Sequence, residues 1–228
     1  MERRTFLLAS AASLVAAPAL AAVPRLSEYV VLLGDRTGSA TDTASGLSLL
    51  GGAFDDPGSG VRLFRKVKVG RTGRVRYRLT RTIDPAVTTS EGVWFNVGLV
   101  WGRNPGTLDP SINDGDVAIA PLFKGFRITH ANKNTVTPTA SDKMRLKTYP
   151  SRTDIRPREA QVTDLFAKDV PHDMELVWGA GVVTLHDRTM GLKQSFRSAA
   201  LKPPSAGAWL MWYASPGGGF LLGDVTVP

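Results

Sequence analysis

Short stretches in which apolar and polar residues alternate do most to constrain the fold of this chain. Roughly ten of them lie between residues 28 and 227, and each ends in a turn rich in Gly, Pro or Asp. Alternation puts every second side chain on one face of a strand, so one face of each strand is suited to a buried core. The chain is therefore predicted to be all-β, a two-sheet antiparallel β-sandwich with at most one short surface helix near residues 158–168.

The first 21 residues are predicted to be a removable leader rather than part of the folded domain. Arg3 and Arg4 precede an apolar run that extends to Val15, and residues 19–21 (Ala-Leu-Ala) fit a signal-peptidase site. This arrangement is typical of twin-arginine export. We expect residues 22–228 to form a single domain in the periplasm or outside the cell, with no transmembrane segment in the mature chain.

The composition narrows the class of partner. The chain has no Cys and carries a formal net charge of +8, from 28 Lys and Arg against 20 Asp and Glu. An exported basic protein is not expected to meet nucleic acid, so an acidic polysaccharide or other anionic glycan is the expected partner. The alternative is a charge that serves only solubility. The sequence leaves the oligomeric state open.

The stretch Val61–Thr82 is predicted to form a β-hairpin with one basic face. The loop Arg71-Thr72-Gly73 has glycine at the position where a three-residue hairpin loop needs a positive φ. In that register Lys68 stands opposite Arg76, and Arg78 lies on the same face. Directly opposed like charges destabilise a sheet unless an anion or water screens them, so this face is a candidate surface for an anionic ligand.

A similar division between an apolar and a polar face recurs later in the chain. Residues 92–101 place Trp94 and Asn96 opposite the predicted core side, and the strands expected at 123–130 and 144–149 place Arg and Lys opposite theirs. We expect these faces and the hairpin to form one ligand surface. The predicted ligand-binding residues are Lys68, Arg76, Arg78, Trp94, Asn96, Arg127, Arg145 and Lys147.

Two stretches near the end of the chain resemble a known superfamily. His172–Asp187 (HDMELVWGAGVVTLHD) and Gly218–Val227 (GGFLLGDVTV) are similar to a strand pair and to the closing strand of the concanavalin A-like lectin/glucanase (jelly-roll) superfamily. The resemblance, carried mainly by residues 172–227, implies a jelly-roll sandwich and carbohydrate binding. It also implies that no cofactor is required apart from a possible structural calcium near Asp224.

Two other functions stay open. The E-x-D-x-x-E carboxylate cluster of the jelly-roll glucanases is absent, so a retaining glycosidase is not expected. A polysaccharide lyase needs a base and an acid beside a group that neutralises the uronate, and His130 and Tyr149 are the candidate catalytic pair. A structural protein of the cell envelope is the third possibility.

Overall fold

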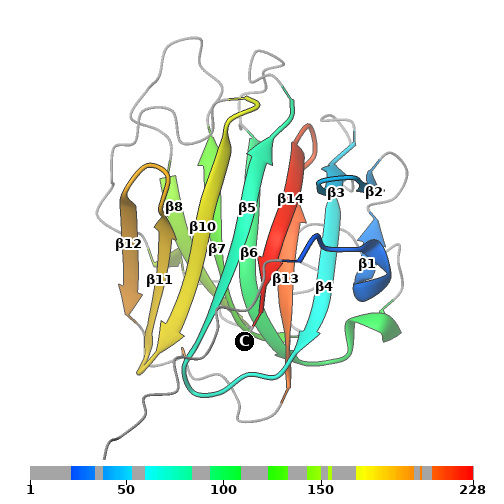
Figure 1. Ribbon diagram of the computed structural model, residues 1–228. Coiled ribbons are helices and arrows are strands. Elements are labelled where there is room, and N and C mark those ends of the chain that lie inside the picture. Colours follow the sequence, from blue (N-terminus) through cyan, green and yellow to red (C-terminus); the bar gives the residue numbers. More distant parts are fainter. Residues whose placement is uncertain are drawn as a thin grey trace, which may run out of the picture.

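The computed structural model describes residues 22–33, 38–52, 60–83, 93–108, 123–132, 143–149, 154–155, 168–197, 201 and 207–227. In this part of the chain fourteen strands form two antiparallel sheets of seven strands each, which confirms the predicted all-β sandwich (Figure 1). The leader at residues 1–21 and residues 158–167 of the expected helix lie outside the described residues. No helix within the described ranges is long and apolar enough to cross a membrane.

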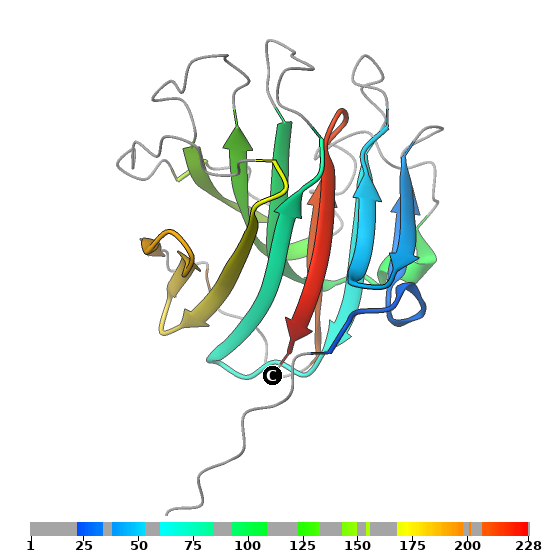
Figure 2. The same cartoon turned by 45° about the horizontal axis from the view of Figure 1, so that its top comes forward.

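The two sheets, here called sheet I and sheet II, lie face to face, with sheet II in front in Figure 1 and the same two layers seen from a second direction in Figure 2. Sheet I has the order β1 (Val30–Leu33), β4 (Val61–Val67), β13 (Ala208–Ala214), β6 (Val93–Gly102), β7 (Phe123–Asn132), β8 (Lys143–Tyr149) and β9 (Asp154–Ile155). Sheet II has the order β12 (Leu192–Arg197), β11 (Val182–Asp187), β10 (Pro171–Gly179), β5 (Gly73–Arg81), β14 (Gly219–Thr226), β3 (Gly46–Leu50) and β2 (Ser39–Thr43). Two short 3-10 turns, η1 (Leu26–Glu28) and η2 (Pro105–Thr107), complete the described elements.

The main hydrophobic core lies between the two sheets and follows from the alternation in the sequence. Along β10 and β11 every second residue is buried, as a strand with one buried face requires. The inward residues of β6 also belong to this core, as predicted from the sequence: Phe95, Val97 and Leu99. Burial of these alternate apolar side chains is the main free-energy gain that holds the two layers together.

The predicted hairpin at Val61–Thr82 is wrong, because its two strands belong to different sheets. β4 pairs with β1 and β13 in sheet I, whereas β5 pairs with β10 and β14 in sheet II. The physical reason is charge. A hairpin would set Lys and Arg opposite each other, whereas pairing β5 with β10 sets Arg76 opposite Glu175 and Arg78 opposite Asp173. The chain therefore crosses from one layer to the other at residues 68–72.

Gly73 is required for a different reason from the one that the sequence suggested. It is not among the glycines with positive φ. Instead, a Cβ atom at this position would overlap the Cζ2 atom of Trp178, whose buried ring belongs to the core and whose Nε1 donates to the Gly70 carbonyl oxygen at 3.4 Å. A large aromatic ring on β10 thus covers the start of β5.

A second apolar cluster lies on the outer side of sheet I. Phe64, Val100 and Met211 point away from the main core, and Leu108, which follows η2, packs with them and with Phe123. The sequence predicted that the second face of β6 is open to a ligand, but Val100 and Asn96 on that face are buried. Part of the outer side of sheet I is therefore buried, including the polar residues Arg62, Asn96 and Arg127.

Substituting Gly73 by Ala is expected to lower the free energy of unfolding by about 1–3 kcal/mol, because the added methyl group overpacks a core that has no space for it. Urea unfolding followed by Trp fluorescence measures this change. Gly207→Ala is the matched control: its Cβ would meet the Val67 carbonyl oxygen at an ordinary 3.5 Å, so a change within about 0.5 kcal/mol is expected. Equal effects of the two substitutions would contradict the packing of Trp178 on Gly73.

Candidate functional site

The predicted ligand-binding residues fall on two separate faces, so the single shared basic face is wrong. Arg76 and Arg78 lie on the outer side of sheet II, whereas Asn96 and Arg127 lie on the outer side of sheet I. Lys68 is exposed in the connection that follows β4. The main core separates these two faces, so one ligand cannot bridge them directly.

The backbone register of sheet I brings six of the predicted residues to one side of adjacent strands. Asn96 on β6 pairs with position 129 on β7, which pairs with position 145 on β8, and these three positions form one row across the sheet. Gly98, Arg127 and position 147 form the next row in the same way. On the same side, position 94 lies two residues before Asn96 on β6, and position 149 lies two residues after position 147 on β8. The residues at these register positions are Trp94, Asn96, Arg127, Arg145, Lys147 and Tyr149.

Sequence reasoning missed two residues, Arg62 and Tyr213, which extend the Asn96 row across β13 to β4. Arg62 on β4 pairs with Tyr213 on β13, and Tyr213 pairs with Asn96. The Arg62 guanidinium carbon lies 4.3 Å from the centroid of the Tyr213 ring, a cation–π contact. No spacing in the sequence signals this contact, because residues 62 and 213 meet only through the strand order of sheet I.

The buried polar cluster formed by Arg62, Asn96, Arg127 and Tyr213 has the chemistry of a site for a polar or anionic group. Its members are all at least nine-tenths buried. Burial raises the pKa of Tyr213, and the charges of Arg62 and Arg127 oppose that rise. Both guanidinium groups therefore act on the same phenol, which places two cations beside one neutral hydroxyl.

Asn96 is the exceptional member of this cluster. It is fully buried, and within the described part of the chain neither its amide nitrogen nor its amide oxygen has a hydrogen-bond partner. An unpaired buried polar group costs about 1–3 kcal/mol, so native proteins rarely keep one without a use for it. The neighbouring Gly98 is explained by packing, because a Cβ there would overlap the backbone of β7 at Phe126 and Arg127.

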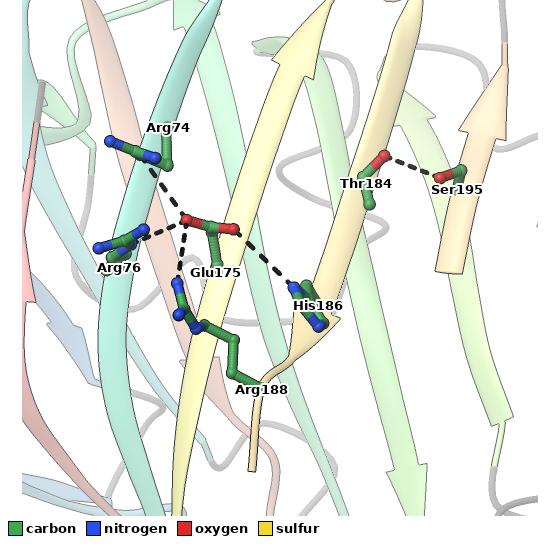
Figure 3. Close-up of polar contacts among 7 residues, drawn as sticks. All are labelled: Arg74, Arg76, Glu175, Thr184, His186, Arg188 and Ser195. Carbon is green, nitrogen blue, oxygen red and sulfur yellow. Dashed lines mark hydrogen bonds and ion pairs between the residues drawn. The ribbon is translucent and has the colours of Figure 1, made fainter. Parts of the chain in front are cut away.

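The outer face of sheet II carries a different arrangement, centred on Glu175 (Figure 3). Arg76 Nε donates to Glu175 Oε1 at 2.8 Å, and Arg74 Nε and Arg188 Nη1 lie 3.7 and 4.0 Å from the same oxygen. His186 Nδ1 lies 3.9 Å from Glu175 Oε2. One carboxylate thus contacts three guanidinium groups, two from β5 and one from the turn after β11.

These contacts set the ionisation of Glu175. Burial acts to raise the pKa of this carboxyl group, but the hydrogen bond from Arg76 and the charges of Arg76, Arg74 and Arg188 together outweigh it and lower the pKa below the usual 4.5. Glu175 is therefore ionised at neutral pH. Its single negative charge orders the arginine side chains but cannot neutralise all of their positive charges.

Arg78 and Asp224 bind each other on the same face. Arg78 Nη1 lies 2.6 Å from Asp224 Oδ2, and Arg78 Nε donates to Asp173 Oδ1 at 3.2 Å. Asp224 has a left-handed φ of 49°, which turns its side chain at an irregularity in the pairing of β14 with β5. Among the described residues, no three His, Cys, Asp or Glu side chains are grouped to hold a metal ion. The calcium expected near Asp224 stays a prediction.

The candidate catalytic pair is separated by the register of sheet I. The His130 backbone pairs with Phe95 and Met144, whereas the Tyr149 backbone pairs with Gly125. Five residues along β7 separate these two pairings, roughly 16 Å at the rise of a β-strand. By the alternation of the strands, the two backbone positions also belong to opposite faces of sheet I. The backbone therefore does not bring His130 and Tyr149 together as a base and an acid.

A buried contact between a histidine and an aspartate was also missed by sequence reasoning. His172 Nδ1 and Asp187 Oδ2 are 2.6 Å apart, and Asp187 Oδ1 accepts from the Met190 backbone N–H at 3.1 Å. Burial raises the pKa of Tyr77, and the Asp187 charge raises it further. Fifteen residues separate His172 from Asp187 in sequence, and only the pairing of β10 with β11 brings them together. This pair stabilises the turn that leads into β12.

Comparisons with known proteins identify the fold. No protein-family model matches the chain, and no curated protein matches it significantly. It is similar to a Bacillus subtilis protein of unknown function with a galectin-like fold, at a TM-score of 0.59 and 12% identity over 89% of each chain. It is also similar to lectin I-B4 from Griffonia simplicifolia, at a TM-score of 0.53 and 12% identity over 89% of this chain and 93% of that one. A third likeness is to carbohydrate binding module CBM66 from Bacillus subtilis, at a TM-score of 0.50 and 8% identity over 88% and 94%.

At these identities the comparisons show the fold. It is a lectin-like β-sandwich, in agreement with the fold implied by the resemblance to the concanavalin A-like superfamily.

Glu175→Gln is expected to lower the free energy of unfolding by about 1 kcal/mol at neutral pH, because it removes the charge that Arg76, Arg74 and Arg188 stabilise. The folded pKa lies below 4.5, so this contribution is present above about pH 4.5 and is lost as the pH falls through the folded pKa. Urea unfolding of both proteins between about pH 3 and pH 7 measures the difference.

Asp169→Asn is the control for this experiment. Its carboxylate is 71% exposed and lies 3.9 Å from Lys168, and Asn tolerates the left-handed φ of 62° at this position. A stability difference close to zero at every pH is expected for it. A loss for Glu175→Gln that persists unchanged at the acid end would mean that the Glu175 charge is not what stabilises the cluster.

Proposed function

We propose that this protein binds an anionic glycan on the outer face of sheet I, and that it does so after export to the periplasm or the cell exterior. The lectin I-B4 and CBM66 structures share its fold and are, by their names, a lectin and a carbohydrate-binding module. This likeness supports a glycan as the class of ligand. The leader predicted at residues 1–21 supports the location.

The observation that carries the proposal is the unpartnered side-chain amide of Asn96. An amide offers two N–H donors and one carbonyl acceptor, which match the mixed donor and acceptor character of sugar hydroxyl groups. On sheet I it lies between Tyr213 and the rows that run across β7 and β8 towards the short edge strand β9.

The cations of this face support an acidic glycan rather than a neutral one. Arg62 and Arg127 are buried beside Tyr213, and the register adds positions 145 and 147 on β8, which are Arg and Lys. Guanidinium groups bind carboxylates with two parallel hydrogen bonds, and this pairing is stronger where water is excluded. A uronate carboxylate is the group that such a site recognises best.

Asn96→Leu is expected to weaken glycan binding at least about fivefold, because binding loses two or three hydrogen bonds of about 0.5–1.5 kcal/mol each. The free energy of unfolding is expected to stay level or to rise by up to about 1 kcal/mol, since an unpaired buried amide is replaced by an apolar group of similar size. Calorimetric titration with oligosaccharides of alginate and polygalacturonate measures the affinity, and urea unfolding measures the stability.

Thr184→Val is the matched control, since it replaces a polar side chain by an apolar one on the outer face of sheet II, where Thr184 Oγ1 contacts Ser195 Oγ at 2.8 Å. It is expected to leave oligosaccharide affinity unchanged. Undiminished binding by Asn96→Leu would contradict the proposed site. A large loss of stability would show that the amide stabilises the folded protein. Equal affinity for neutral oligosaccharides would contradict the anionic specificity.

A further inference from the structure

We propose that the outer face of sheet II is a second binding surface, separate from the glycan site, and that it takes a linear polyanion with repeating carboxylate or sulfate groups. The surface is the arginine cluster of Arg74, Arg76, Arg78 and Arg188 (Figure 3 shows three of the four). It lies on the opposite side of the sandwich from Asn96, so occupation of one face leaves the other accessible.

The first argument is the balance of charge on this face. Among its described residues the cations are the four arginines of the cluster with Lys193 and Arg197 on β12, six in all, and the carboxylates are Asp173, Glu175 and Asp224, three in all. The internal ion pairs therefore leave an excess of three positive charges on one side of one sheet. A surface with this excess attracts polyanions and orients them as they approach.

The second argument is geometric. Arg74, Arg76 and Arg78 alternate along β5, so they project from the same face at intervals of roughly 7 Å. Their side chains are 59, 46 and 49% exposed, and the Arg188 side chain is 47% exposed. A line of exposed cations at regular intervals matches a polymer with regularly repeated acidic groups better than it matches a single small anion.

The third argument is preorganisation. The Glu175 side chain is only 12% exposed, and it lies at the centre of three guanidinium groups that it holds at 2.8, 3.7 and 4.0 Å. Each guanidinium has five N–H donors, and these contacts use one nitrogen of each, so further donors are left for an external oxyanion. Side chains that are already ordered lose less conformational entropy when a ligand binds.

A double substitution, Arg76→Ser with Arg188→Ser, tests the surface. Each exposed charge pair contributes between about a 1.4-fold and a fivefold change in affinity, so the loss of two cations is expected to weaken polyanion binding by roughly 2- to 25-fold at low salt. The probes are heparin, polygalacturonate and neutral dextran, each immobilised, with retention measured across a salt gradient. Heparin and polygalacturonate separate sulfate from carboxylate recognition, and dextran is not expected to bind.

Lys124→Ser with Lys168→Ser is the control, since it removes the same charge from two exposed lysines outside the cluster. Lys124 pairs with Trp101 in sheet I. Lys168 bridges to Arg81 at the end of β5, three residues beyond Arg78, the last arginine of the cluster on that strand. Retention within about twofold of the wild type is expected, against the larger loss for the cluster variant.

Three results would overturn the proposal. They are an equal loss in the control pair, retention on dextran, and binding confined to vesicles of anionic lipid, which would assign the face to a membrane surface. Asn96→Leu separates this surface from the proposed function, because heparin retention should survive that substitution even where oligosaccharide affinity is lost. Conversely, Arg76→Ser with Arg188→Ser should leave the affinity for a short oligosaccharide at the Asn96 site intact.

Discussion

The crossing from sheet I to sheet II between β4 and β5 is the constraint on which the arrangement of charged groups depends. Val61 and Leu63 on β4 and Val75 and Leu79 on β5 belong to the one core between the sheets, so the two strands face each other across it. Their polar residues must then point in opposite directions. The basic residues of one short stretch of sequence are thereby divided between two outer faces, and no single ligand can contact both sets.

Electrostatic pairing in sheet II is consistent with this crossing. β5 presents three arginines on its outer face, and a like-charged neighbour would be unfavourable there. β10 instead supplies Asp173 and Glu175 directly opposite Arg78 and Arg76. The same carboxylates that allow β5 to pair with β10 also order the arginines, so one set of contacts serves both the fold and the proposed polyanion surface.

Sheet I solves a different problem. Its outer face carries a second apolar cluster around Phe64, Val100 and Met211, and polar side chains on the same face are buried as well. Arg62 contacts the Tyr213 ring, and the Asn96 side chain has no hydrogen-bond partner among the residues that the structure describes. Burial of the Asn96 amide without a hydrogen bond opposes folding, and we propose that it is kept because it recognises a glycan.

Alternation in the sequence predicts the strands with one well-buried face, and β6, β10 and β11 lie where it places them. It misses β2, β9 and β12, which are edge strands, because a strand with one neighbour and little burial needs no strong apolar pattern. Alternation also identifies which face of a strand is buried, but it does not identify the sheet to which the strand belongs. The predicted hairpin at Val61–Thr82 is wrong for that reason. The sequence could predict that Asn96, Arg127, Arg76 and Arg78 lie on the polar faces of their strands. It could not predict that these strands belong to two different sheets.

The central claim is that recognition is divided between two opposite faces of one sandwich. Mapping of backbone and side-chain amide NMR shifts during titration with an acidic hexasaccharide tests it most directly. The account predicts two separate groups of shifted signals, one at Asn96 and the neighbouring residues of β6 to β8, the other at Arg74, Arg76 and the facing residues of β10. A single continuous group of shifted residues, or shifts confined to loops away from both sheets, would contradict it.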